Sequence, residues 1–161
     1  MRQTNDGTQA VRVDNHTFVT QISAILKKGT YKSVTFTVQG YSMRPFLEHD
    51  RDKVELVLPQ KPQTGQVVLA EIMPRTYALH RIIKIEGDTI TMRGDGNQLS
   101  QTETFTADKI IATAISFTRK GKKVGVDSRR WRLYSLLWDK LKPIRRILLG
   151  IHRRIIKFIK I

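Results

Sequence analysis

The chain has 161 residues, of which 40% are hydrophobic, so it is long enough for one domain with a buried core. It contains no cysteine, which excludes a disulfide framework, a thiolate nucleophile and a cysteine-based zinc site. Its formal net charge is +15, with 29 lysine and arginine residues against 14 acidic residues, and this balance indicates an anionic partner.

The positive charge is concentrated near the C-terminus. Residues 129–161 hold 11 basic residues and one acidic residue, Asp139, so they carry +10 of the total. The polar N-terminus has no apolar run long enough for a signal-peptide core or a membrane span. We therefore expect a cytoplasmic protein that the basic segment attaches peripherally to the inner face of a membrane.

The first expected element is a helix from about Thr17 to Lys28, within an N-terminal segment that covers residues 1–30. Thr17 is placed to cap this helix, and Gly29 stands just after its end. Its apolar residues recur at helical spacing and indicate a face packed on a core: Phe18, Ile22, Ile25 and Leu26. Residues 1–15 form a lead-in to it.

After Tyr31 the pattern changes to short strands separated by glycine, proline and aspartate. Apolar alternation or continuous apolar runs predict strands at residues 34–38, 54–58, 66–73, 77–85, 89–92 and 110–117. Gly87 and Asp88 form a predicted hairpin turn. Strands of this number and length predict a mostly β domain over residues 31–118, partly closed or sandwich-like.

The stretch GYSMRP, residues 40–45, directly follows the first predicted strand. Gly40 permits a backbone conformation that other residues resist, and Pro45 fixes its own φ and pushes Arg44 toward an extended conformation. Ser42 is therefore expected on a rigid loop with its hydroxyl exposed and N–H groups nearby, as a serine nucleophile requires. The same residue types also form ordinary turns, so a turn serine is the alternative.

A second segment with chemical potential comprises the strand LHRII and the later loop RGDGN, residues 93–97. On a strand, His80 shares a face with Ile82 and lies opposite Arg81. A lone histidine in an apolar strand is usually structural, and loops rich in glycine, aspartate and asparagine form turns for local reasons. Neither segment identifies a site by itself.

Together and in this order, the GYSMRP, LHRII and RGDGN segments resemble the signal peptidase I and LexA-like superfamily of serine peptidases. The HRI strand is similar to the histidine-type branch of archaeal and endoplasmic-reticulum signal peptidases. The resemblance covers residues 31–118 and implies that β fold. It also implies Ser42 as the nucleophile, His80 as the general base and Asp95 as the carboxylate that orients the imidazole.

The resemblance also assigns roles around the nucleophile. Met43 and Pro45 match residues that shape the loop, and backbone N–H groups from the same loop, which includes Tyr41, supply the oxyanion hole. Lysine-type bacterial enzymes use a hydroxyl side chain two residues before the nucleophile. Here that position is Gly40, so only the backbone is available.

The chain departs from the family pattern at the third catalytic position. Many histidine-type relatives have a second aspartate where this chain has Gln101, with Glu103 close by. The partner of His80 is therefore Asp95, Glu103, or no carboxylate at all. The chain shows no anchor like that of signal peptidases, and the residues before Val34 are too few for the helix-turn-helix domain of LexA-like repressors.

After a basic linker at residues 119–128, residues 129–161 are predicted to form a helical tail, with Pro143 kinking or dividing the helix. Its apolar residues form one stripe with basic residues beside it: Tyr134, Leu137, Leu141, Ile144, Leu148, Ile151, Ile155 and Phe158. With Trp131 and Trp138 near its start, this pattern favours an anionic membrane surface. Packing on the β domain and self-association are alternatives. Nucleic acid is disfavoured, because aromatic residues are not interleaved with basic ones.

The sequence thus predicts a serine endopeptidase of the signal-peptidase-like type that cleaves a peptide or leader near a membrane surface. The alternatives are an inactive peptide-binding module of the same fold and a DNA-associated LexA-like regulator. No metal or organic cofactor is predicted, since the four histidines show no recognisable ligand spacing: His16, His49, His80 and His152.

Overall fold

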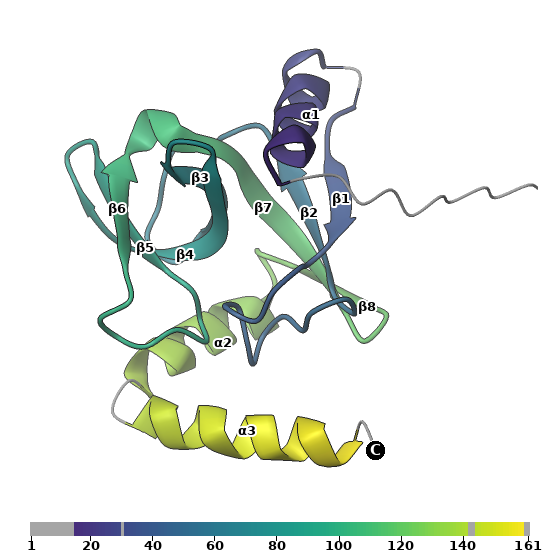
Figure 1. Ribbon diagram of the computed structural model, residues 1–161, viewed down its shortest axis with the longest axis vertical. Coiled ribbons are helices and arrows are strands. Elements are labelled where there is room, and N and C mark those ends of the chain that lie inside the picture. Colours follow the sequence, from purple (N-terminus) through teal and green to yellow (C-terminus); the bar gives the residue numbers. More distant parts are fainter. Residues whose placement is uncertain (1–14, 30, 142–143, 160–161) are drawn as a thin grey trace, which may run out of the picture.

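The computed structural model describes residues 15–29, 31–141 and 144–159, and within them it is mostly β (Figure 1). The strands are β1 (Val34–Thr37), β2 (Lys53–Val57), β3 (Val67–Met73), β4 (Thr76–Glu86), β5 (Thr89–Arg93), β6 (Glu103–Thr106), β7 (Ile110–Arg119) and β8 (Lys122–Gly125). The helices are α1 (Asn15–Lys27), α2 (Arg129–Lys140), α3 (Arg145–Ile159) and a short 3₁₀ helix at Ala107–Lys109.

All the strand pairs are antiparallel and form one sheet in the order β1-β2-β7-β3-β4-β5-β6, with β8 added to β7. The register shifts within four of these pairings, and such bulges bend strands, as the curved course of β3 and β4 illustrates (Figure 1). The bent sheet encloses two apolar clusters, one between α1, α2 and the β1 side, the other within β3 to β6. The predicted mostly β class is confirmed.

All six predicted strands are present, each within two residues of its predicted ends. The predicted Gly87-Asp88 turn is also confirmed, because Glu86 pairs with Thr89 across it and Gly87 has a φ of 58°. Two short strands were not predicted, namely β6 and β8.

The segment 119–128 was predicted to be a linker, but it contains β8 and belongs to the sheet. Lys120 and Gly121 both have positive φ values, 48° and 77°, and they connect the paired residues Arg119 and Lys122 in a tight hairpin. The basic strand is tolerated at this edge because Lys123 Nζ lies 2.8 Å from Glu55 Oε2.

Helix α1 begins at Asn15, two residues before the predicted cap at Thr17. Its end is as predicted, since Gly29 has a φ of 68° and donates its N–H to the Leu26 carbonyl at 3.1 Å. The helix buries Val19, Ile22 and Leu26 against β1 and β4, so its core-packing role is confirmed. The predicted face was wrong at Ile25, which is 36% exposed.

Helix α2 is part of the domain and not of a separate tail. Trp131 and Trp138 are only 5% and 7% exposed. The centroid of the Trp131 ring lies 4.6 Å from the ring centroids of both Phe46 and Phe117. The two tryptophans and Tyr134 follow one another at spacings of three and four, which places them on one face of the helix. For this half of the segment, the packing alternative is correct.

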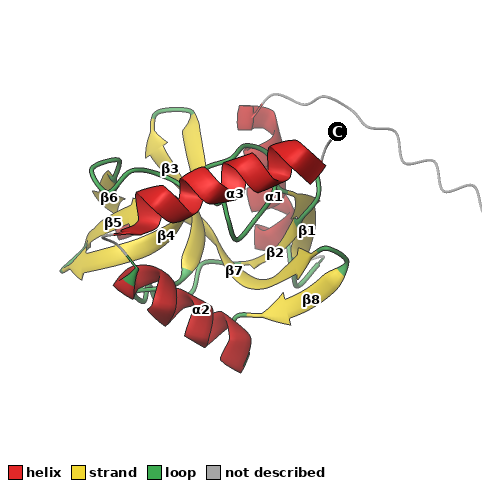
Figure 2. Cartoon of the chain, turned by 90° about the horizontal axis from the view of Figure 1, so that it is seen from below, coloured by secondary structure: helices red, strands yellow, loops and turns green. Residues whose placement is uncertain are grey.

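The single stripe predicted over residues 129–161 is divided between two helices. Helix α2 ends at Lys140 and α3 begins at Arg145, while Pro143 lies outside the described residues. Figure 2 shows α3 running across the lower face of the molecule, beside α2. Among the described residues, every helix is too short or too polar to cross a membrane.

Candidate active site

Ser42 lies on a loop that is held at both ends by the core. Gly40 has a φ of 89° and donates its N–H to His49 Nδ1 at 3.0 Å, which turns the chain sharply after β1. Just after the serine, Met43 and Phe46 are each 2% exposed, and the Leu47 N–H donates to the Met43 carbonyl at 2.9 Å. Ser42 itself is half-buried, so its surroundings are fixed while it stays accessible.

Other predicted loop residues stabilise this shape. The Tyr41 ring supports the Arg44 guanidinium, whose carbon lies 4.1 Å from the ring centroid, and Arg44 also forms a bidentate pair with Glu48. The Arg44–Pro45 peptide is cis, and the Pro45 carbonyl accepts a hydrogen bond from Arg119.

Two glycines of the RGDGN loop pack directly against the serine loop. Gly96 donates its N–H to the Ser42 carbonyl at 2.7 Å. A Cβ on Gly94 would lie 2.5 Å from the Ser42 carbonyl oxygen and 2.9 Å from His80 Nε2, and a Cβ on Gly96 would lie 2.9 Å from the Arg44 carbonyl oxygen. The absence of side chains at Gly94 and Gly96 therefore brings the serine loop and His80 to the same short stretch of backbone.

His80 lies on β4, is 5% exposed, and contacts a carboxylate through Nδ1. That carboxylate is Glu103, whose Oε2 lies 3.0 Å from Nδ1. Glu103 is the first residue of β6 and pairs with Met92 of β5, so the meander of β4, β5 and β6 brings it to the histidine. In this arrangement Nε2 remains on the side of Gly94 and the serine loop.

Asp95 has other contacts in the described part of the chain. Its carboxylate oxygens accept hydrogen bonds from Arg81 Nε at 2.8 Å and from Arg81 Nη2 at 2.6 Å, and Asp95 is 1% exposed. Arg81 follows His80 directly on β4, so this buried ion pair ties the RGDGN loop to the histidine strand. Of the two carboxylates considered from the sequence, the structure brings Glu103 to His80 Nδ1 and Asp95 to Arg81.

Helix α2 completes this network from behind the site. Trp138 Nε1 donates to the Asp95 carbonyl at 3.1 Å, the Tyr134 hydroxyl donates to Asp95 Oδ2 at 3.3 Å, and Arg81 Nη1 donates to Ser135 Oγ at 2.9 Å. Burial, followed by the nearby Asp95 charge, raises the pKa of Tyr134, so its hydroxyl remains a donor at any ordinary pH. Sequence reasoning missed these supporting roles, although the helical spacing of Trp131, Tyr134 and Trp138 was a usable signal.

The residues that could stabilise an oxyanion are also in place. Within the described residues, the N–H groups of Ser42 and Met43 donate to no acceptor. In the same part of the chain, Ser42 Oγ and His80 Nε2 do not form a hydrogen bond with each other. Catalytic hydrogen bonds are often long without substrate and tighten when it binds.

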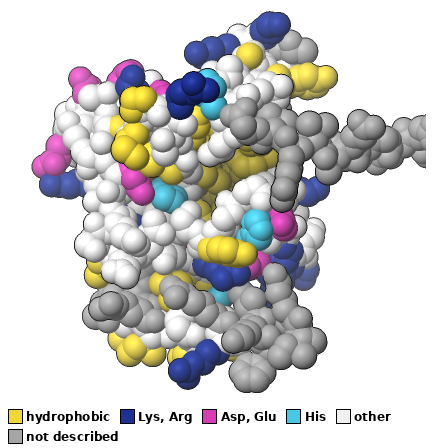
Figure 3. Space-filling model, viewed as in Figure 1, with side chains coloured by type: hydrophobic (Ala, Val, Ile, Leu, Met, Phe, Trp, Pro, Cys, Tyr) yellow, Lys and Arg dark blue, Asp and Glu magenta, His cyan; other side chains and the backbone are white. Residues whose placement is uncertain are grey.

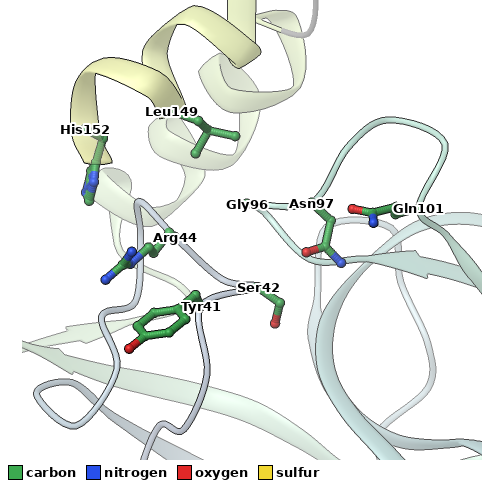
Figure 4. Close-up of a pocket in the computed structure, with 8 residues that line it drawn as sticks. All are labelled: Tyr41, Ser42, Arg44, Gly96, Asn97, Gln101, Leu149 and His152. Atoms are coloured by element: carbon green, nitrogen blue, oxygen red, sulfur yellow. The ribbon is translucent and has the colours of Figure 1, made fainter. Parts of the chain in front are cut away.

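Two cavities meet at Ser42, which among the described residues is the one that lines both. The larger, of about 920 Å³, runs between β1 and the first half of β4 and includes residues of α1 and His80. Figure 3 shows apolar side chains in a hollow on this face of the molecule, below α1. The smaller, of about 420 Å³, lies between the serine loop and α3 (Figure 4).

No family model matches the chain, and no curated protein matches its sequence. The chemical assignment therefore depends on the geometry described above.

Proposed function

We propose that the protein is a serine endopeptidase with a signal-peptidase- and LexA-like β domain, in which Ser42 is the nucleophile and His80 the general base. One observation carries this proposal: Gly94 packs against both the Ser42 carbonyl oxygen and His80 Nε2, while Glu103 contacts the other ring nitrogen of the histidine. A nucleophile next to a base that a third group orients is the arrangement that acyl transfer requires.

The reaction follows from these positions. His80 Nε2 accepts the proton of Ser42 Oγ as Oγ forms a bond to the scissile carbonyl carbon. The N–H groups of Ser42 and Met43 donate to the resulting oxyanion. The imidazolium, which Glu103 stabilises, then protonates the leaving amine as the C–N bond breaks, and water activated by the same histidine hydrolyses the acyl-enzyme.

Glu103 takes the orienting role first assigned to Asp95. Asp95 acts as a positioning residue, because its ion pair with Arg81 holds the RGDGN loop, and with it Gly94 and Gly96, against the serine loop.

The substrate in this proposal is an extended peptide. Among the described residues, β1 pairs with β2 alone, and β4 residues 76–80 pair with β3 alone, so each has a free edge beside the larger cavity. Free edges bind an extended chain through backbone hydrogen bonds, and the apolar lining, which includes Phe36, Val38, Leu69 and Leu79, favours small or apolar side chains. This geometry supports a peptide or leader over a compact protein.

An anionic membrane surface is the proposed location. Six large aliphatic residues of α2 and α3, and Ile144 just before α3, are between 44% and 65% exposed: Leu133, Leu136, Leu137, Ile144, Ile147, Ile151 and Ile155. Exposed basic residues accompany them, including Arg129, Arg130, Arg132, Lys140 and Arg154. Figure 3 shows hydrophobic and basic side chains together along the lower edge, where these helices lie. Such a surface binds the headgroup region of anionic lipid.

The test combines labelling with cleavage. Wild type is treated with a fluorophosphonate probe, which modifies activated serines, and is separately incubated with a pool of leader-like peptides and anionic vesicles. We expect labelling at Ser42 and new peptide termini, both lost in Ser42→Ala and His80→Ala. Glu103→Gln should reduce cleavage by about 10²–10⁴-fold. Ser100→Ala, at an exposed position, is the matched control.

A non-catalytic peptide-binding module is the second candidate, because the Ser42–His80 hydrogen bond is not formed in the described residues. In that case wild type and Ser42→Ala would bind the same peptides equally, and neither would cut them or react with the probe.

A further inference from the structure

The smaller cavity next to Ser42 has no role in the mechanism above. It has a volume of about 420 Å³, and its walls come from three parts of the chain (Figure 4). The serine loop contributes Tyr41, Ser42 and Arg44, the RGDGN loop and the residues after it contribute Gly96, Asn97 and Gln101, and α3 contributes Leu149 and His152. The cavity is thus formed only when α3 lies over the site.

Most of the residues around this cavity carry a polar side chain, among them Asn97, Gln101 and His152. His152 Nδ1 is buried and has no hydrogen-bond partner among the described residues. Burial lowers the pKa of His152, so the ring is neutral near pH 7 and can offer a donor or an acceptor. Gln101 Oε1 accepts from the Gln98 N–H at 3.0 Å, which leaves its amide N–H groups for a ligand. Because the protein encloses Nδ1, the other ring nitrogen, Nε2, is the one that a ligand can contact, together with the Gln101 amide.

The position of the cavity suggests what binds in it. A peptide whose scissile carbonyl lies at Ser42 extends in one direction along the groove between β1 and β4. In the other direction it meets the cavity under α3, because Ser42 is the residue common to both. Arg44 lines the cavity with its charge balanced by Glu48, and the exposed Arg154 is on the same helix as His152. The unbalanced charge nearby is therefore positive, and a cationic side chain is disfavoured there.

Resting on the proposed function, we infer that this cavity binds the part of the peptide substrate that lies beyond the scissile bond from the groove, and that it selects a polar or acidic side chain there. His152 and Gln101 supply the hydrogen bonds, and Leu149, which is 7% exposed, forms the apolar wall. Helix α3 is therefore a specificity-determining element of the active site.

The experiment uses the full chain, a fluorophosphonate probe and a pool of 14-residue peptides randomised on both sides of a central small residue. Leu149→Trp fills the cavity, and His152→Leu removes its polar group at similar volume. Leu58→Trp places the same bulk at an exposed position that is given no role in binding and serves as the matched control. Mass spectrometry of the products gives the residue preference at each position, and circular dichroism confirms that each variant is folded.

We expect all three variants to react with the probe at Ser42, which shows that the nucleophile is still present and active in each. Leu149→Trp should cleave the pool at least about tenfold more slowly. His152→Leu should lose about tenfold of the preference for a polar or acidic residue at one position, the size of one hydrogen bond. Leu58→Trp should match wild type in rate and preference.

The possible failures are distinguishable. If wild type neither reacts with the probe nor cleaves the pool, the proposed function is overturned and the cavity assignment with it. If wild type reacts and cleaves, while Leu149→Trp and His152→Leu keep the wild-type rates and preferences, the cavity assignment alone is overturned.

Discussion

Helices α2 and α3 share a basic, amphipathic residue pattern but differ in how they pack on the domain. Both are basic and carry apolar residues at spacings of three and four. Helix α2 buries Trp131 and Trp138 and donates hydrogen bonds to Asp95, whereas α3 buries Leu149 and leaves Ile147, Ile151 and Ile155 about half to two-thirds exposed. The difference is that the inner face of α2 carries aromatic rings with hydrogen-bond donors.

The comparison teaches that amphipathicity alone does not distinguish a packed helix from a surface-binding helix. An aromatic side chain with a polar group suits a membrane interface and a domain interior equally well. What decides for α2 is a buried acceptor at the matching position, Asp95, together with the rings of Phe46 and Phe117. Beneath α3 lies the cavity that Leu149 and His152 line.

Among the changes considered, Asp95→Ala should have the largest effect on the free energy of unfolding, because Asp95 joins α2 to the candidate site. This change leaves the Arg81 guanidinium buried without its counterion, and losing one partner of a buried ion pair costs about 3–5 kcal/mol. We expect a loss of about 4 kcal/mol in the free energy of unfolding, measured with urea. The double variant Asp95→Leu with Arg81→Met should recover most of it. A loss below about 1 kcal/mol would contradict the role given to this pair.

The second-largest loss of stability is expected for Trp131→Ala, which removes the main packing contact of α2. Removing a buried tryptophan that contacts Phe46 and Phe117 creates a cavity, and we expect a loss of about 3 kcal/mol in the free energy of unfolding. Leu133→Ala, on the exposed side of the same helix at 58% exposure, should change the value by less than about 0.5 kcal/mol. Equal effects of the two changes would mean that α2 does not pack as described.

Strand β8, which precedes α2, is held to β2 by the ion pair of Lys123 with Glu55, and the contribution of this pair to stability should depend on pH. Hydrogen bonds from Lys123 of β8, Ser116 and Ser33 lower the pKa of Glu55 from 4.5 to about 2. Because the folded state favours the carboxylate, its contribution to stability is complete above pH 4.5 and is lost as the pH falls toward 2. Glu55→Gln should therefore cost about 2 kcal/mol at pH 7 and almost nothing near pH 2, measured by thermal unfolding. A cost independent of pH would contradict the charge-based account.

The smallest effect on stability, and the clearest on binding, is expected from the outer face of α3. Ile147→Asp with Ile151→Asp places two charges on exposed positions, so the free energy of unfolding should stay within about 0.5 kcal/mol of wild type. Binding to vesicles that contain about 30% anionic lipid, measured by sedimentation, should fall by at least about tenfold. The pair Ile147→Leu with Ile151→Leu is the control. Unchanged partitioning of the aspartate variant would exclude this face as the binding surface.

Much of the β domain could be predicted because each strand keeps its own apolar pattern between turn residues. The two strands that were missed lack such a pattern: β6 has a single buried residue, Phe105, and β8 is basic. Both are strands only because a neighbour pairs with them, and that information is not local. The N-terminal end of α1 was misplaced by two residues for a related reason, since the spacing of apolar residues does not fix a helix end.

The residues of the candidate site could be predicted from the sequence, but which of their side chains contact each other could not. Ser42 and His80 were proposed from the resemblance that three segments carry together. The partner of the histidine depended instead on the register of β5 with β6, which sets Met92 opposite Glu103. A shift of one residue in that pairing would turn Glu103 to the other face. The role of Asp95 likewise depended on Arg81, whose side chain the alternation of the strand directs away from Ile82.

The contact at Gly94 also bears on how the site tolerates substitution. Any other residue there introduces a Cβ 2.5 Å from the Ser42 carbonyl oxygen, so the serine loop or the histidine strand must shift, although neither has been mutated. A chain that retains Ser42, His80 and Glu103 but has alanine at this position would keep every chemical group and lose their alignment. Inspection of the reactive side chains alone would therefore misjudge such a variant as intact.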